Sequence, residues 1–311
     1  MRITTAVIPL AAAISMLAIQ TAAAQKAAPS ANPATPAATP APPPPAPATS
    51  ACANPNALGV SRVVAINTTG GPGFGFEHFK QLDFLRDKEV VLTFDDGPWP
   101  VNTPAVIKAL DEECTKAIFF PIGKHATWHP EILKSVAAHG HTIGSHTWSH
   151  ANLNNKKLTD DQRKAEIEKG ISAVKWALGY SPAPFIRFPA LQHPPSMVTY
   201  MGERNIAMWS CDVDSFDFKA RNARKIVETV MNKLDKTGKG IILMHDFQKH
   251  TGEALPELLK RLKAGGYKVV EVKAKTKLES IAQYDEEVVK GLKQPVVNSR
   301  PLSSVVETIS Q

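Results

Sequence analysis

Short apolar runs alternate with amphipathic stretches from about Ser61 onward, and this alternation restricts the possible folds more than any other feature of the sequence. The apolar runs predict strands at Arg62–Ile66, Glu89–Phe94, Lys116–Ile122, His141–Ile143, Phe185–Phe188, Ile206–Ser210, Gly240–Met244 and Tyr267–Val270. The stretches between them predict helices at Thr103–Glu113, Pro130–Ala138, Thr159–Leu178, Ser196–Arg204, Ala220–Asp235 and Glu253–Ala264. Strands that alternate with helices form parallel sheets joined by crossover connections. We therefore expect an α/β fold, a closed or nearly closed (β/α) barrel of about seven parallel strands.

The first 24 residues have the features of a secretory signal peptide. Arg2 supplies the positive charge, an apolar core runs from about Ala6 to Ile19, and small residues at 21–24 suit cleavage before Gln25. This core is shorter than the roughly 20 residues that span a bilayer, so a retained N-terminal anchor is the weaker alternative. We expect an exported protein, periplasmic or secreted, with no stable membrane insertion after cleavage.

An Ala- and Pro-rich segment follows the leader and includes the run Pro42–Pro45. Such a composition cannot bury a core and favours an extended, semi-rigid tether. The sequence therefore divides into a signal peptide (1–24), a linker (25–58), a barrel (59–272) and a C-terminal extension (273–311). Apolar periodicity is lost in the extension, which we expect to be partly helical, around Leu278–Leu292, or disordered.

The formal net charge is +7, and removal of Arg2 with the leader would leave +6. This charge favours anionic surroundings such as acidic glycans or cell-envelope polymers. The positive residues are scattered rather than clustered with aromatic residues, which argues against a nucleic-acid partner. Cys52, Cys114 and Cys211 follow the leader, and an odd number leaves at least one thiol unpaired. The sequence indicates neither which two would pair nor the oligomeric state.

The segment Thr93–Pro98 places two adjacent carboxylates, Asp95 and Asp96, where the apolar run Val90–Leu92 ends. Side chains alternate along a strand and the Gly-Pro turn redirects them, so neighbouring acids can take different roles. One could hold a metal ion while the other handles a proton. An isolated turn of this kind could equally cap backbone amides.

Chemically capable side chains also follow other predicted strands. The residues at these strand ends are Asp95, Asp96, His146, His150, Arg187, Asp214, Asp217 and His245. The C-terminal ends of barrel strands share one face, and such folds carry their chemistry there. We therefore expect these side chains to form one site.

His146 and His150 are four residues apart, a spacing that would put both imidazoles on one helical face and within reach of a single cation. With Asp96 they form a set of two histidines and one carboxylate, which leaves positions open for water and substrate. This set suits a divalent metal, with zinc as the first candidate and cobalt, nickel and iron as alternatives. A pair of histidines that binds no metal is the simpler interpretation, but the two aspartates at the end of another strand argue against it.

The sequence resembles the polysaccharide deacetylase (NodB-homology) family, also called carbohydrate esterase family 4. The resemblance spans roughly Glu89 to Val270 and rests on segments that occur in the family's order. These segments are Thr93–Pro98, His146–His150, Arg187–Pro189, Asp214–Phe218 and Leu243–His245. This resemblance implies a distorted (β/α) barrel that removes acetyl groups, usually from N-acetylglucosamine units in chitin oligomers or peptidoglycan and sometimes from xylan.

The resemblance also implies roles for the residues on the water side of the reaction. Asp96, His146 and His150 would be the metal ligands. Asp95 would be the general base, and Arg187 would pair with it and orient it. A base of this kind takes the proton of the attacking water.

On the leaving-group side, the resemblance implies that His245 is the general acid, that Asp217 holds it, and that Leu243 lines a small pocket for the acetyl methyl. The backbone N–H of Ala190 is the positional candidate for stabilising the oxyanion. Family members often have an aromatic residue where Ala190 stands and Trp where Phe218 stands. These departures leave the metal chemistry intact and put the identity of the substrate in doubt.

We therefore predict an exported, metal-dependent deacetylase whose partner is an acetylated glycan. An O-acetyl esterase that uses the same site on a polymer such as acetylated xylan is the nearest alternative. A glycan-binding wall protein that has lost turnover is the alternative from another class. The presence of Asp95, Asp96, His146, His150 and His245 together argues against it.

Overall fold

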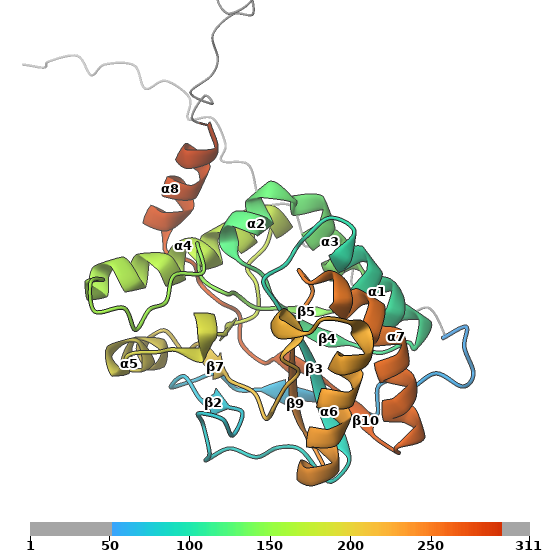
Figure 1. Cartoon of the computed structure of the whole chain (residues 1–311). Helices are drawn as coiled ribbons and strands as arrows, with labels where there is room; N and C mark the ends of the chain where they lie inside the picture. The colour runs from blue at the N-terminus through green and yellow to red at the C-terminus, as the bar shows by residue number, and fades with distance from the viewer. Residues whose placement is uncertain (1–51, 294–311) are drawn as a thin grey trace, which may run out of the picture. The chain divides into compact units, whose positions relative to one another are not determined.

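The computed structural model describes residues 52–293 of the 311-residue chain (Figure 1). The predicted signal peptide, most of the predicted linker and the end of the predicted extension lie outside these residues. Within residues 52–293, every helix is too short or too polar to cross a membrane.

The strands form a larger and a smaller sheet, and all their pairings are parallel. The larger sheet contains β1 (Arg62–Ile66), β10 (Lys268–Ala274), β3 (Glu89–Asp95), β4 (Ala117–Phe120), β5 (Thr142–Ile143), β9 (Gly240–His245) and β8 (Val213–Asp214). The smaller sheet contains β2 (Gly73–Phe74), β7 (Ala207–Trp209) and β6 (Phe185–Ile186). A bridge between Ser145 and Ile186 joins the end of β5 to β6. The predicted parallel α/β architecture is confirmed.

The helices lie outside the strands, with α1, α3 and α7 together on one side and α4 on another (Figure 1). They are α1 (Asn102–Glu112), α2 (Gly123–Trp128), α3 (Pro130–Ala138), α4 (Asp160–Leu178), α5 (Pro195–Glu203), α6 (Ala223–Thr237), α7 (Lys249–Ala264) and α8 (Ala282–Lys293). Two short 3₁₀ turns, η1 (Pro189–Leu191) and η2 (Asp217–Lys219), carry residues of the predicted site.

Burial and capping explain why these elements form. Every residue of β3 is buried, as expected for a parallel strand that is covered on both faces. The helix α4 begins with a capping box. The Thr159 side chain accepts a hydrogen bond from the Gln162 backbone amide, and the Gln162 side chain accepts one from the Thr159 backbone amide. It ends at Gly179, whose φ of 84° is the left-handed conformation that glycine adopts without strain.

Short elements were the ones that the sequence pattern did not predict. The strands β2 and β8 have two residues each and α2 has six, which is too few for a periodic pattern to develop. The strand β10 runs to Ala274, where it still pairs with Ile66 of β1, so the sheet continues past the predicted boundary at residue 272.

The predicted helix of the C-terminal extension is present as α8, although it begins at Ala282 rather than near Leu278. It packs on α4 through ion pairs of Lys169 with Glu287 and Lys175 with Asp285, both 2.7 Å. The buried side chain of Leu278 belongs to the same apolar cluster as Ile167 and Ile171 of α4. The described part of the extension therefore contacts the barrel directly.

A disulfide joins Cys52 to Cys114. The sequence alone did not indicate which two of the three cysteines would pair. Cys211 is a free, buried thiol. Close to the disulfide, the Asn54 side-chain amide donates to the Glu112 carbonyl (3.1 Å) at the end of α1. The beginning of the described chain is thus held against this helix.

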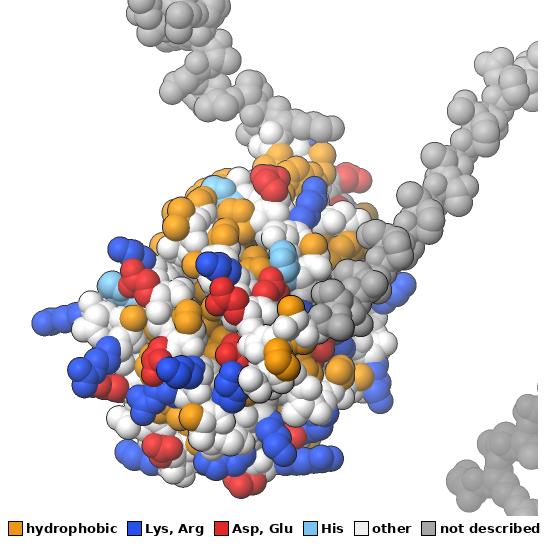
Figure 2. Space-filling view, turned by 90° about the vertical axis from the view of Figure 1, so that its right-hand side faces the viewer, with side chains coloured by type: hydrophobic (Ala, Val, Ile, Leu, Met, Phe, Trp, Pro, Cys, Tyr) orange, Lys and Arg blue, Asp and Glu red, His pale blue; other side chains and the backbone are white. Residues whose placement is uncertain are grey.

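Figure 2 shows Lys and Arg side chains intermixed with Asp and Glu on one face of the molecule. Ion pairs along helices, such as Arg224 with Glu228 (2.7 Å) in α6 and Lys108 with Glu112 (3.8 Å) in α1, also place opposite charges side by side. This face does not concentrate positive charge in the way that a nucleic-acid-binding surface does.

Candidate active site

Two neighbouring strands bring the first pair of candidate residues together. Asp95 is the last residue of β3 and His245 the last residue of β9, and the parallel register places them opposite each other. Because the carboxyl ends of parallel strands meet at one edge of the sheet, this position is where barrel enzymes carry their chemistry. The Asp95 side chain is buried, with 2% of the residue exposed.

The Asp95 carboxylate is held by Arg187, a residue with no exposed surface. Arg187 Nη1 donates to Asp95 Oδ1 (2.8 Å) and to Thr93 Oγ1 (2.7 Å), while Nη2 donates to the Ser210 carbonyl (2.8 Å). The guanidinium also lies 4.7 Å from the centre of the Phe120 ring. These contacts fix the guanidinium, and through it the carboxylate, in one orientation.

Asp96, His146 and His150 form a compact cluster of possible metal-binding atoms. Asp96 Oδ1 lies 3.5 Å from His146 Nε2 and 3.5 Å from His150 Nε2, and all three atoms lie within 4.8 Å of one another. The His146 imidazole is buried, whereas His150 is exposed at the rim. Asp95 Oδ2 lies 3.9 Å from His146 Nε2, so the second carboxylate stands beside this cluster.

The chemistry of the cluster fits a divalent cation. Within residues 52–293, Asp96 Oδ1 is a buried oxygen without a hydrogen-bond partner, and such an atom needs an explanation. His146 Nδ1 bonds the Arg187 carbonyl (2.7 Å), which makes Nδ1 the donor and leaves the Nε2 lone pair facing Asp96. Burial lowers the pKa of His146 and outweighs the nearby carboxylates, so this imidazole is neutral, as a metal ligand must be.

The two histidines lie on a loop, so the expected helical face is wrong. Thr147 and His150 have φ values of 66° and 60°, and this left-handed backbone, not a helical turn, brings the imidazoles together. The loop rests on α4 at Gly170, where an added Cβ would overlap the backbone of Thr147. The two imidazoles are therefore brought together by the conformation of this loop. The loop can pack this closely on α4 because residue 170 is a glycine.

His245 is coupled to a buried carboxylate. Its Nδ1 and its backbone N–H bond the two Asp217 oxygens at 2.6 and 2.7 Å, and Thr251 Oγ1 also donates to Asp217 (2.5 Å). Burial alone would lower the pKa of His245, but the bond to Asp217 and the charges of Asp217, Asp95 and Asp96 outweigh it and raise the pKa to about 9. The imidazole is therefore a proton carrier at neutral pH.

Comparison with known proteins identifies the family. The family model described as polysaccharide deacetylase matches residues 84–209. A chitooligosaccharide deacetylase of Sinorhizobium fredii is 32% identical over 175 residues, which cover 54% of this chain and 80% of that protein. The chain belongs to the polysaccharide deacetylase family.

Other members of the polysaccharide deacetylase family are also similar to this chain. The peptidoglycan-N-acetylmuramic acid deacetylase PdaC of Bacillus subtilis is 32% identical over 202 residues, 65% of this chain. That match covers 41% of PdaC, so the chain spans about two fifths of the length of this relative. A solved peptidoglycan deacetylase of Bdellovibrio bacteriovorus aligns with a TM-score of 0.64 at 31% identity, covering 73% of this chain and 63% of that one. These matches confirm the predicted family and fold class.

The remaining predicted site residues of this polysaccharide deacetylase lie at different depths. Leu243 is buried in β9, two residues before His245 and hence on the same face of the strand. Ala190 is exposed in η1 with a φ of 52°. Phe218 packs edge-on against His245, with ring centres 5.6 Å apart. Asp214 instead accepts from the Phe216 amide (2.8 Å), so it shapes a turn and stays outside the cluster.

The sequence analysis missed a buried carboxylate beneath the aspartate turn. Asp246 accepts from the Gly97 amide (3.1 Å) and from Thr103 Oγ1 (2.6 Å). A Cβ on Gly97 would overlap this carboxylate, which explains the glycine after Asp96. Burial raises the pKa of Asp246 to about 7. Its position directly after His245 at a strand end was the signal that could have identified it.

Proposed function

We propose that this protein removes acetyl groups hydrolytically from N-acetylated amino sugars in an oligo- or polysaccharide such as peptidoglycan or a chitin-type oligomer. One observation supports the proposal: two imidazoles and an Asp96 oxygen that has no hydrogen-bond partner within residues 52–293 lie close enough to hold one cation, beside Asp95 and near the His245–Asp217 pair. Groups suited to cation binding, proton removal and proton donation thus lie within one cluster, buried at His146 and Asp95 and open to solvent at His150. Because a leader is predicted, we propose that the protein acts in the cell envelope or outside the cell.

Asp96, His146 and His150 would hold the divalent cation, with zinc as the first candidate and cobalt, nickel and iron as alternatives. When bound, such an ion polarises the amide carbonyl and acidifies water. Asp95 then takes the proton of the attacking water, since it is the adjacent carboxylate that the cation site does not use. Arg187 would hold the Asp95 carboxylate in one orientation toward the water through the 2.8 Å bond.

The acyl group is positioned by two further residues. The Ala190 N–H stands at the start of η1, where a 3₁₀ turn leaves its first amides without intrahelical acceptors, and would donate to the developing oxyanion. The Leu243 side chain would line the pocket for the acetyl methyl, because it shares the strand face of His245.

The amine must leave as a protonated group, and His245 would supply that proton. Asp217 keeps the imidazole protonated near neutral pH and fixes its Nδ1, so that Nε2 faces the leaving nitrogen. An alkoxide leaves with less help than an amine. His245→Ala is therefore expected to slow amide substrates more than esters.

The family members described above support N-acetylated sugars as the substrate class. One acts, by its name, on chitooligosaccharides and another on N-acetylmuramic acid in peptidoglycan. Both are N-acetylated glycans, and the two matches cover 54% and 65% of this chain.

Acetate release by zinc- or cobalt-loaded protein tests the proposal across peptidoglycan, chitin oligomers and acetylated xylan. We expect release from peptidoglycan or chitin oligomers. Release from acetylated xylan alone would show an O-acetyl esterase. Glycan binding by metal-loaded protein without acetate from any of the three would show a non-catalytic binding protein.

A further inference from the structure

A cleft of about 360 Å³ opens beside the metal-ligand cluster, on the side of α2. Its walls combine two residues of the cluster with aromatic and basic side chains that the chemistry above does not use. The lining includes Asp96, His150, Lys124, His125, Trp128 and Phe247. A ligand that occupies this cleft would therefore touch the reacting centre.

Trp128 gives the cleft an exposed but fixed aromatic wall. The residue is 57% exposed, yet its ring packs on His125 with centres 5.1 Å apart. His125 is itself fixed, because its Nδ1 bonds the Asp96 carbonyl (2.6 Å) and its ring packs against Trp99 (5.1 Å). An indole held in this way offers a flat apolar face at little entropic cost, which suits the C–H face of a pyranose.

Lys124 gives the same cleft an uncompensated positive charge. Its backbone is fixed by a bond from its amide to the Trp148 carbonyl (2.9 Å), and within residues 52–293 its ammonium has no carboxylate within 4.0 Å. Asp96 is the one carboxylate in the lining, and it already faces His146 and His150. The cleft is therefore suited to a substituent with a negative charge.

We propose that this cleft binds the sugar next to the one that is deacetylated, with its ring against Trp128 and a carboxylate-bearing substituent near Lys124. This inference rests on the proposed function and narrows it to an anionic N-acetylated glycan. Peptidoglycan strands have this chemistry, since every second sugar carries a lactyl carboxylate, whereas chitin-type oligomers are neutral.

Two oligomers of equal length test the inference. One is a tetrasaccharide of alternating N-acetylglucosamine and N-acetylmuramic acid without peptides, and the other is chitotetraose. Their dissociation constants are measured by titration calorimetry on zinc-loaded protein in the Asp95→Asn background, where turnover should be slow. Acetate release by the unmodified protein is measured separately, so that the proposed function and the cleft are tested by different readouts.

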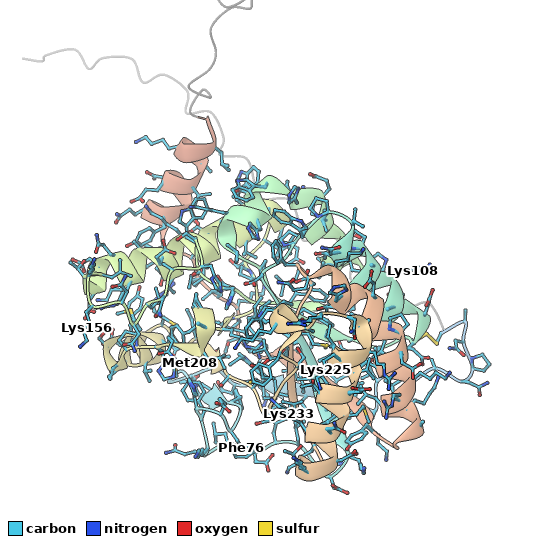
Figure 3. The ribbon with its side chains drawn as sticks, in the orientation of Figure 1. Phe76, Lys108, Lys156, Met208, Lys225 and Lys233 are labelled. Carbon is cyan, nitrogen blue, oxygen red and sulfur yellow. A yellow bond between two sulfur atoms is a disulfide. The ribbon has the colours of Figure 1, made fainter. Side chains whose placement is uncertain are left out.

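In the parent protein, the muramic tetrasaccharide should bind more tightly than chitotetraose. Lys124→Met should reduce this preference about two- to fivefold, the range expected for a partly exposed ion pair. Trp128→Ala should weaken binding of both oligomers by about tenfold, and Trp128→Phe should recover part of the loss. Lys108→Met is the matched control, because Lys108 points outward from α1 (Figure 3) and is not among the residues that line the cleft.

An unchanged preference in Lys124→Met, tighter binding of chitotetraose by the parent, or unchanged binding in Trp128→Ala would each overturn the assignment of the cleft. Absence of acetate release from both oligomers would overturn the proposed function, and the binding preference would still decide the role of the cleft.

Discussion

Asp95 and Asp96 are neighbours in the chain with different surroundings, and this difference separates their chemistry. Asp95 ends a buried strand and receives a charged hydrogen bond from Arg187. Asp96 has a φ of 74°, which turns its carboxylate away from the strand and toward His146 and His150. Under the proposed function, one of these adjacent acids would hold a cation and the other would take a proton.

The proposed general acid, His245, depends on the carboxylate of Asp217. Asp217→Asn removes the charge that raises the pKa of His245 to about 9, so the basic limb of the kcat/KM profile should move to lower pH. The activity at about pH 8 should fall by roughly tenfold or more. In the folded wild type, the protonated imidazole stabilises the protein fully below its ordinary pKa near 6.5, and this stabilisation is lost as the pH rises through about 9.

Profiles of kcat/KM from about pH 6 to about pH 10 provide the measurement. Asp214→Asn is the control, because Asp214 belongs to the same turn but bonds a backbone amide. It should move the basic limb less. A basic limb that stays in place in Asp217→Asn would show that His245 is not the titrating acid.

At the scale of elements, the loop that carries the proposed metal ligands His146 and His150 depends on α4 behind it. Gly170 of α4 faces the backbone of Thr147, and an added methyl would overlap it. Gly291 of α8 has no heavy atom within 4 Å of the corresponding position. The same substitution in two helices therefore separates helix propensity from contact with the loop.

Gly291→Ala should stabilise the protein by up to about 1 kcal/mol, because alanine is the better helix former. Gly170→Ala should instead destabilise it by about 1–3 kcal/mol and lower the affinity for zinc, because the loop that carries His146 and His150 must shift. Urea denaturation and zinc titration measure the two effects. Equal stabilisation by both substitutions would mean that the loop does not rest on Gly170.

Whole-molecule features show what the sequence pattern could predict. The order of strands and helices follows from periodicity, and the site follows from polar residues at strand ends, because β3 and β9 are long enough to show where they end. The pattern could not predict the loop geometry of His150, the depth of Asp246 or the packing of Trp128 on His125. The first depends on a left-handed residue and the second on a contact between segments far apart in sequence. The third joins side chains three residues apart in α2, a helix of six residues that is too short to show a periodic pattern.

The disulfide acts at this scale too, since it connects residues 62 positions apart. Cys114→Ser should lower the free energy of unfolding by up to roughly 4 kcal/mol, because it removes a constraint on the unfolded chain. Turnover by the folded protein should stay unchanged, because neither cysteine contacts the site. The double variant with Cys52→Ser should lose no more than either single variant, and an additive loss would contradict this pairing.

The metal content of two neighbouring variants tests the central claim most directly. Asp96→Asn and Asp95→Asn are purified, loaded with zinc, dialysed and analysed by mass spectrometry, and acetate release is measured on the same samples. We predict that Asp96→Asn loses both the metal and the activity, whereas Asp95→Asn keeps about one ion per chain and loses at least about a hundredfold in turnover. Loss of zinc from Asp95→Asn with zinc retained in Asp96→Asn would contradict this account.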